Sequence, residues 1–137
     1  MLDTCVLIYM MSDHGSLDKY VSEILMDSGN VLCVSAETIK ELIVNYNNKT
    51  LLSSMWRTCH EMVSYILDDM SIKVLPIDKN VLNTYSSLDL NLQNNHKDPS
   101  DHIIISHAIT AKIPLISSDR KFEFYKSQGL DLIFNNK

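Results

Sequence analysis

The sequence has few of the residues on which several common protein classes depend. It contains three glycines, three prolines and three cysteines in 137 residues. Three glycines are too few to build the Gly-rich loops that bind nucleotide phosphates, and no Cys-x-x-Cys pair occurs. We therefore expect no nucleotide cofactor, no cysteine-based zinc site and no disulfide framework.

Long apolar runs and an excess of basic residues are also missing. No apolar run reaches the roughly 18 residues that a membrane helix needs. No basic leader with an apolar core and a cleavage site opens the sequence, so we expect a cytoplasmic protein without a membrane partner. The formal net charge is −5. A passive nucleic-acid binder usually has a basic excess, because phosphate neutralisation supplies its affinity, so any RNA contact is expected to be local.

The sequence does contain enough apolar residues for one folded domain. The hydrophobic fraction is 45%, which suffices for a full core at this length. No internal repeat or linker divides the chain. We therefore predict a single domain that spans residues 1–137.

Short apolar runs alternate with helical patterns along the chain. Runs of apolar residues predict buried strands, and apolar residues spaced by three and four predict helices. The predicted strands are a short start at 1–4, which apolar residues 5–10 continue, and 31–34, 72–75, 114–117 and 130–134. The predicted helices are 17–28 with Ser16 as cap, one capped by Ser35, 51–70, 78–88 capped by Asp78, one opening at Asp98-Pro99, and 120–128 ending near Gly129. This alternation indicates an α/β fold with a mainly parallel sheet.

Four acidic residues lie where predicted strands end or predicted helices begin. Asp3 and Asp119 follow strands, whereas Glu41 and Asp101 lie in the first or second turn of helices. Each could be a helix cap or a surface charge. Ligands of open parallel sheets bind beyond the carboxyl ends of the strands, and all four side chains are expected to reach that crevice.

Converging carboxylates repel one another, which raises their pKa values, and a divalent cation removes this repulsion. Mg²⁺ prefers oxygen ligands and takes one or two carboxylates directly. Such a site can polarise a phosphate oxygen and generate a nucleophilic hydroxide. The four acids therefore favour phosphodiester hydrolysis.

Four blocks of the sequence carry a resemblance to a known family. They are Leu2-Asp3-Thr4 followed by Val6–Ile8, Val34–Ala36 leading to Glu41, Asp98–Ile105, and Pro114–Asp119 with Phe122. The chain resembles the PIN-domain ribonucleases, in particular the VapC-like toxins of type II toxin–antitoxin pairs. The resemblance covers nearly the whole chain. Its most specific parts are the Asp-Pro-x-Asp helix start and the strand that leads into x-Asp-x-x-Phe.

The resemblance implies a three-layer α/β/α sandwich and a Mg²⁺-dependent endoribonuclease, in which metal-activated water attacks an RNA phosphodiester. It implies that Asp3, Asp101 and Asp119 hold Mg²⁺ or Mn²⁺, and that Glu41 orients a metal-bound water as the fourth catalytic residue. A small antitoxin that blocks the cleft and a homodimer are also implied. Two further residues match positions where the family has supporting hydroxyl groups, Thr4 and Ser117.

Two of these assignments have competitors, and the first strand departs from the family pattern. Glu37 competes with Glu41, since both lie on one helix face four residues apart. We prefer Glu41 because its distance from Ser35 fits the family better. Asp98 either caps its helix or lies at the edge of the site. The family usually has a longer apolar lead-in before the first Asp, so a short first strand is expected here.

Two other functions stay open at this stage. An aspartyl phosphatase or phosphotransferase would use Asp3 as a nucleophile, but enzymes of the haloacid-dehalogenase type begin with Asp-x-Asp, and residue 5 is Cys here. A binding module that keeps the fold without activity would bind no metal tightly. Of the five histidines, we single out His96, in the loop before Asp98, as a candidate substrate contact. Basic residues that could line an RNA path are Lys49, Arg57, Lys97, Arg120 and Lys121.

Overall fold

Four short strands form two parallel pairs in the computed structural model, which describes residues 1–137. Strand β1 (Cys33–Ser35) pairs with β2 (Lys73–Leu75), and β3 (Leu115–Ser117) pairs with β4 (Leu132–Phe134). The central residue pairs are Val34 with Val74 and Ile116 with Ile133. All observed strand pairing is parallel, as the sequence predicts.

The first three residues lie between the two strand pairs and connect them. The backbone N–H of Leu2 donates to the carbonyl of Cys33 at 2.8 Å. On the other side, Ile116 donates to the carbonyl of Met1 at 2.9 Å, and Asp3 donates to that of Ile116 at 3.0 Å. The predicted first strand is thus reduced to one parallel bridge between Leu2 and Ile116. This bridge places Asp3 beside the carboxyl end of β3.

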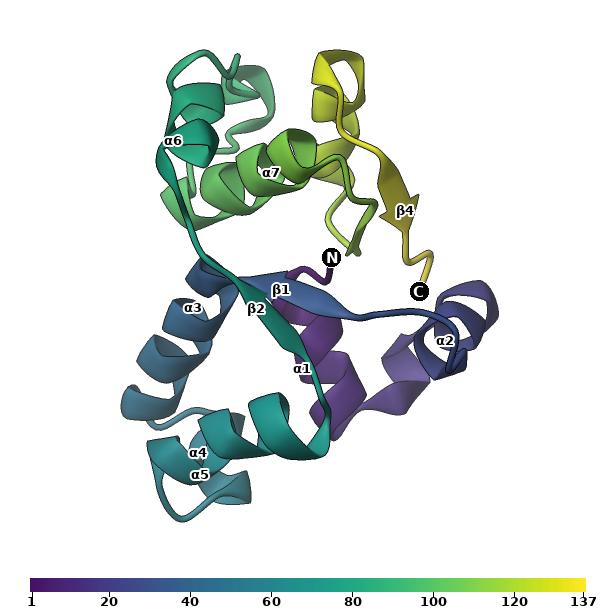
Figure 1. Cartoon of the computed structure of the whole chain (residues 1–137), viewed down its shortest axis with the longest axis vertical. Coiled ribbons are helices and arrows are strands. Elements are labelled where there is room, and N and C mark those ends of the chain that lie inside the picture. The colour runs from purple at the N-terminus through teal and green to yellow at the C-terminus, as the bar shows by residue number, and fades with distance from the viewer.

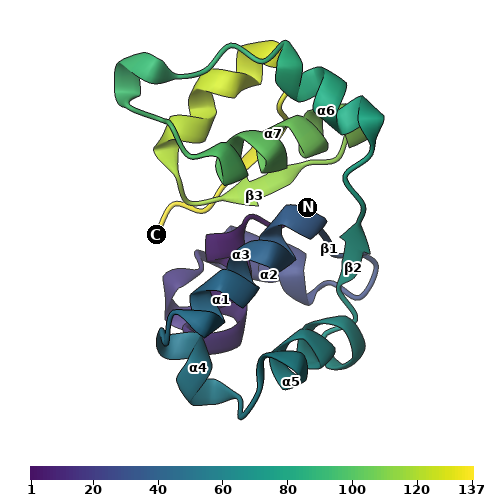
Figure 2. The same ribbon diagram turned by 90° about the vertical axis from the view of Figure 1, so that its left-hand side faces the viewer.

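Helices make up most of the remaining chain. Their bounds are α1 Thr4–Ser12, η1 His14–Ser16, α2 Lys19–Met26, α3 Ala36–Asn47, α4 Leu51–Met55, α5 Cys59–Ser64, the π-helix η2 Tyr65–Asp69, α6 Lys79–Ser86, η3 Leu92–Asn94, α7 Pro99–Ala111 and the 3₁₀ helix η4 Arg120–Gln128. Figures 1 and 2 show α6 and α7 on one side of the strands, and α1, α3, α4 and α5 on the other. None of these helices is both long and apolar enough to cross a lipid bilayer.

Two apolar clusters hold these elements together. The larger cluster joins Leu2 to the helices before β2, and its members include Leu2, Val6, Leu7, Val34, Leu42, Met62, Ile66 and Ile116. The second cluster packs α7 and η4 against β3, and its members include Ile104, Ile105, Ala108, Leu115, Phe122 and Tyr125. Phe122, which the sequence singled out, is fully buried. The two clusters fix both walls of the region where the acids meet.

Several helix ends lie where local chemistry predicts them. Ser35, Asp78 and Asp98 are N-caps whose side chains accept from backbone N–H groups two or three residues ahead. Pro99 occupies the first helical position of α7. Gly129 ends η4 with φ of 101°, a left-handed conformation that glycine adopts without strain.

Other elements differ from the predictions. Residues 5–10 do not continue a strand but form α1, because Asp3 caps a helix that begins at Thr4. Helix α2 is capped by Asp18 rather than Ser16. The predicted helix 51–70 is three elements, because the chain is extended at Trp56 and Thr58 caps a new helix. The predicted strand 31–34 is β1, two residues later at its start.

Candidate metal centre

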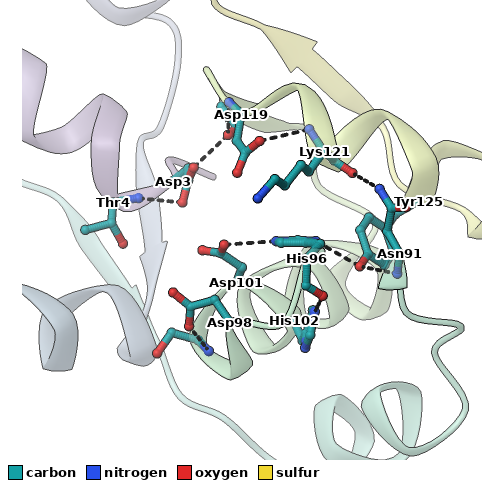
Figure 3. Close-up of polar contacts among 12 residues, drawn as sticks. Asp3, Thr4, Asn91, His96, Asp98, Asp101, His102, Asp119, Lys121 and Tyr125 are labelled. Carbon is teal, nitrogen blue, oxygen red and sulfur yellow. Dashed lines mark hydrogen bonds and ion pairs between the residues drawn. The ribbon is translucent and has the colours of Figure 1, made fainter. Parts of the chain in front are cut away.

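Asp3 is anchored at the bottom of the candidate site. Its Oδ1 accepts from the backbone N–H of Thr4 at 2.8 Å, and its Oδ2 accepts from the hydroxyl of Ser117 at 2.6 Å. The same Ser117 hydroxyl accepts from the backbone N–H of Asp119 at 3.1 Å. One hydroxyl therefore ties Asp3 to the turn that carries Asp119, and Figure 3 shows both carboxylates directed into one space.

Asp3 is poorly placed to act as a nucleophile. The side chain is 5% exposed, and both of its oxygens accept hydrogen bonds. The residue at the position of a phosphatase's general acid, Cys5, donates its thiol to the Oδ2 of Asp3 at 3.3 Å. Burial, followed by the charge of Asp3, raises the pKa of this thiol to about 12. These contacts disfavour a phosphatase mechanism at Asp3.

Asp101 lies at the centre of two groups of possible metal ligands. In the first group, ligand atoms of His96, Asp101 and Asp119 all lie within 4.8 Å of one another. In the second group, the same limit holds for Glu41, Asp98 and Asp101. Asp3 belongs to neither group. The structure thus brings Glu41, Asp101 and Asp119 together with His96 and Asp98, and it leaves Asp3 outside both groups but tied to Asp119 through the hydroxyl of Ser117.

Glu41, not Glu37, faces this region. The hydroxyl of Thr4 donates to Oε2 of Glu41. Glu37 instead lies 2.6 Å from the ammonium of Lys40 and accepts from the hydroxyl of Ser100 at 2.7 Å. The two glutamates share a helix face, but tertiary contacts separate their surroundings.

Asp98 combines both of the positions that the sequence left open. Its Oδ1 accepts from the backbone N–H of Ser100 at 2.9 Å, which makes it the N-cap of α7. Its ligand atoms also lie near those of Glu41 and Asp101. A small pocket of about 180 Å³ borders this edge of the site, between Glu41 and Asp98. Asp98 is exposed, so it marks the solvent side of the cluster.

Burial and mutual repulsion perturb the acids strongly. Burial, followed by the charges of Asp3, Asp98 and Asp119, raises the pKa of Asp101 to about 7. Burial also raises the pKa of Glu41 to about 7. The hydrogen bond from Thr4 acts to lower this pKa, and the charge of Asp101 acts to raise it. The pKa of Asp3 is raised as well, first by burial. A cluster that holds protons this tightly near neutral pH gains most from a cation.

These shifts predict that the metal-free protein loses stability as pH rises. Below about pH 4, both Asp101 and Glu41 are protonated in the folded and the unfolded chain. Between about pH 4 and 7 only the folded chain retains those protons, so unfolding releases them and stability falls with rising pH. We expect the free energy of unfolding to fall by about 2 kcal/mol over this pH range, after allowing for solvent screening.

The measurement is urea unfolding in EDTA at several pH values between 4 and 8, compared with the double variant Asp101→Asn/Glu41→Gln. The histidines and the other acids are the same in both proteins, so the difference between the two pH profiles reports on Asp101 and Glu41 alone. Equal pH dependence in the two proteins would show that these two carboxyls are not perturbed.

His96 is the site residue whose role the sequence did not identify. It is 2% exposed and its Nε2 lies 2.9 Å from Oδ2 of Asp101. Its position in the loop before Asp98 drew attention to it as a substrate contact, but it is buried beneath Asp101. His102 and His107 are hydrogen-bonded core residues: His102 contacts the carbonyl of His96, and His107 contacts the hydroxyl of Ser35.

The donor set fits a hard divalent cation. It consists of carboxylate oxygens with one imidazole nearby and no thiolate ligand, which is the chemistry that Mg²⁺ and Mn²⁺ accept.

Comparison with known sequences identifies the family: the PIN-domain pattern matches residues 1–126. The chain belongs to the PIN-domain family. No curated protein matches it by sequence.

Solved structures share the fold of this PIN domain over nearly its whole length. VapBC2 from Rickettsia felis, bound to a DNA fragment from its promoter, matches with a TM-score of 0.73 and 19% identity, covering 98% of this chain and 96% of the other. VapBC-1 from nontypeable Haemophilus influenzae matches with a TM-score of 0.72 and 22% identity, covering 100% of this chain and 98% of the other. A toxin–antitoxin complex from Klebsiella pneumoniae matches with a TM-score of 0.62 and 16% identity, covering 99% of this chain and 97% of the other. At these identities the likeness shows the α/β fold.

Proposed function

We propose that this PIN domain is a Mg²⁺-dependent endoribonuclease, with Mn²⁺ as an alternative ion, and the toxin of a type II toxin–antitoxin pair. The observation that carries the proposal is the position of Asp101. It is shared by two groups of ligand atoms within 4.8 Å, and burial, followed by the charges of neighbouring acids, raises its pKa to about 7. A cation that neutralises such a cluster gives it both stability and chemistry.

We assign the cation to Asp3, Asp101 and Asp119, bound directly or through water. Although both oxygens of Asp3 accept hydrogen bonds, Oδ1 accepts only one and keeps acceptor capacity. Thr4 and Ser117 support the site through the backbone N–H and the hydroxyl that fix Asp3. When bound, the cation polarises the scissile phosphate and lowers the pKa of the attacking water.

Glu41 is assigned to the attacking water. Its Oε2 accepts from Thr4, which leaves Oε1 to orient the water and take up its proton. A carboxylate whose pKa is about 7 can accept and release a proton at neutral pH. Asp98, at the solvent edge, is close enough to Glu41 to influence this transfer.

A basic residue beside the acids supports a phosphate substrate. Figure 3 shows the side chain of Lys121 extending toward Asp101 and Asp119. Its charge acts to lower the pKa of Asp101, against the effect of the acids. We assign Lys121, which is exposed, to a phosphate group of the RNA backbone.

The wider assignments follow from the fold and the family. We propose that residues 1–137 act as one domain, in which Met1–Asp3 is the central strand of a parallel sheet and the helices on its two faces make a three-layer α/β/α sandwich. The solved complexes of similar fold support a protein antitoxin as partner. We further propose that the protein is a cytoplasmic homodimer.

The test is digestion of total RNA by purified protein that has been stripped of metal. We expect cleavage to appear with Mg²⁺ or Mn²⁺ and to disappear with EDTA. A small phosphate ester is offered in parallel, since phosphate release without RNA cleavage would point to a phosphatase. Tight Mn²⁺ binding without either activity would contradict the nuclease, and absence of Mn²⁺ binding would mark a binding module.

A further inference from the structure

A buried hydrogen-bond chain runs from η4 to Asp101. The hydroxyl of Tyr125 lies 2.9 Å from Nδ1 of His96, and Nε2 of His96 lies 2.9 Å from Oδ2 of Asp101. Tyr125 is fully buried, and His96 is 2% exposed. Figure 3 shows the imidazole between the phenol and the carboxylate.

The donors along this chain can be assigned from its far end. The backbone N–H of Asn91 donates to the Tyr125 oxygen at 3.0 Å. The phenol proton then has one acceptor within the protein, Nδ1 of His96. The neutral imidazole must carry its proton on Nε2, and it donates that proton to Asp101. The reverse order would leave the buried phenol proton without an acceptor, which costs about 1–3 kcal/mol.

The backbone of His96 is held as firmly as its ring. Nε2 of His102 lies 3.0 Å from the carbonyl oxygen of His96, and His102 is itself 2% exposed. The His96 ring also packs edge-on against His102, with centroids 4.9 Å apart, and against Tyr125 at 5.5 Å. A loop residue held at both backbone and ring presents a fixed donor.

We propose that His96 is a positioning residue that acts through Asp101 and is not itself a ligand of the cation. Its Nε2–H holds Oδ2 of Asp101 and leaves Oδ1, which makes no hydrogen bond within the protein, for the cation. Ligation by Nε2 would require that proton to move to Nδ1, which Tyr125 opposes. This inference rests on the proposed metal-dependent nuclease activity.

The test compares two substitutions that divide the imidazole's contacts. In His96→Gln the amide nitrogen falls near the position of Nε2 and still donates to Asp101. In His96→Asn the amide falls near Nδ1, so the contact with Asp101 is lost. Tyr125→Phe removes the orienting hydroxyl. Tyr85→Phe is the matched control, since the Tyr85 ring lies 6.0 Å from that of His102 and its hydroxyl makes no hydrogen bond within the protein.

The primary readout is the Kd for Mn²⁺ by calorimetry without RNA, on variants shown by thermal melting in EDTA to be folded. Removing a donor to a metal ligand typically weakens metal binding by about 10- to 100-fold, and we expect this for His96→Asn. We expect His96→Gln to stay within a few-fold of the parent, Tyr125→Phe to lie between them, and Tyr85→Phe to be unchanged. In cleavage assays we expect His96→Asn to lower kcat and to leave KM unchanged.

Equal Mn²⁺ affinity in His96→Asn and the parent would overturn the inference, as would an equal loss in the Gln and Asn variants, which would make His96 a ligand. Should His96→Asn fail to fold, unaltered Mn²⁺ affinity in Tyr125→Phe would also refute it. A parent protein that neither binds Mn²⁺ nor cuts RNA would instead refute the proposed function itself.

Discussion

Replacing Asp101 with Asn is expected to abolish RNA cleavage and to stabilise the metal-free protein. The amide keeps the shape of the side chain and can still accept from His96, so the fold is retained. It cannot supply the negative charge that both groups of ligand atoms share. A loss of about 4 kcal/mol of metal-derived transition-state stabilisation corresponds to a fall of about 1,000-fold in kcat/KM.

The two effects of Asp101→Asn have opposite signs, which makes the prediction specific. Removing one charge from a repulsive cluster should raise the urea midpoint at pH 7.5 in EDTA, where the native carboxyl is costly to ionise. Asp131→Asn is the control, because Asp131 is exposed and lies outside both groups. Cleavage by Asp101→Asn at the rate of the parent would refute the assignment of Asp101 to the cation. A folded but inactive variant that is less stable than the parent would show that charge repulsion at Asp101 does not destabilise the metal-free protein.

Glu41→Gln is expected to reduce cleavage by about 100- to 1,000-fold, in the range found when a single positioned acid–base group is removed. The amide can accept from Thr4 but cannot take up a proton from water. We expect Mn²⁺ affinity to change much less than cleavage, because Glu41 is assigned to the water. Its removal also eliminates a group with a pKa of about 7.

Glu37→Gln is the matched comparison for this prediction. It lies one turn away on the same helix and loses an ion pair with Lys40, which is exposed and worth little. We expect cleavage within a few-fold of the parent. The measurement is the initial rate on one RNA substrate with saturating Mg²⁺. Comparable losses in both variants, or a larger loss in Glu37→Gln, would show that the wrong glutamate was assigned.

Helix starts with a strong local cap, such as those of α3, α6 and α7, could be predicted from the sequence because their causes are local. Asp98 followed by Pro99 contains the cap and the first helical residue in adjacent positions, and α7 begins there. Residues 51–70 have a continuous helical pattern, yet the helix breaks at Trp56. Tertiary contacts decide this break, since the carbonyl of Trp56 accepts from the hydroxyl of Tyr46 on α3. A single-sequence pattern does not contain that contact.

The site follows the same division. The approach of Asp3 and Asp119 to one edge could be predicted, because parallel strands bring their carboxyl ends together there; the catalytic roles of the four acids stay a prediction. The preference for Glu41 over Glu37 came from the family pattern and not from the helix periodicity, because the contact that holds Glu37 away comes from Ser100, far along the chain. The connection of His96 to Tyr125 spans 29 residues and depends on the packing of η4 against the loop. No local signal indicates it.

The most direct test of the account is a crystal soaked in Mn²⁺ and measured for anomalous scattering. We predict a peak at about 2.1 Å from carboxylate oxygens of Asp101 and Asp119, with Asp3 bound directly or through water, and no bond to His96. The same soak of Asp101→Asn should lose the peak. A parent crystal without a peak among these carboxylates, at an Mn²⁺ concentration that supports cleavage, would contradict a metal-dependent nuclease built on Asp101.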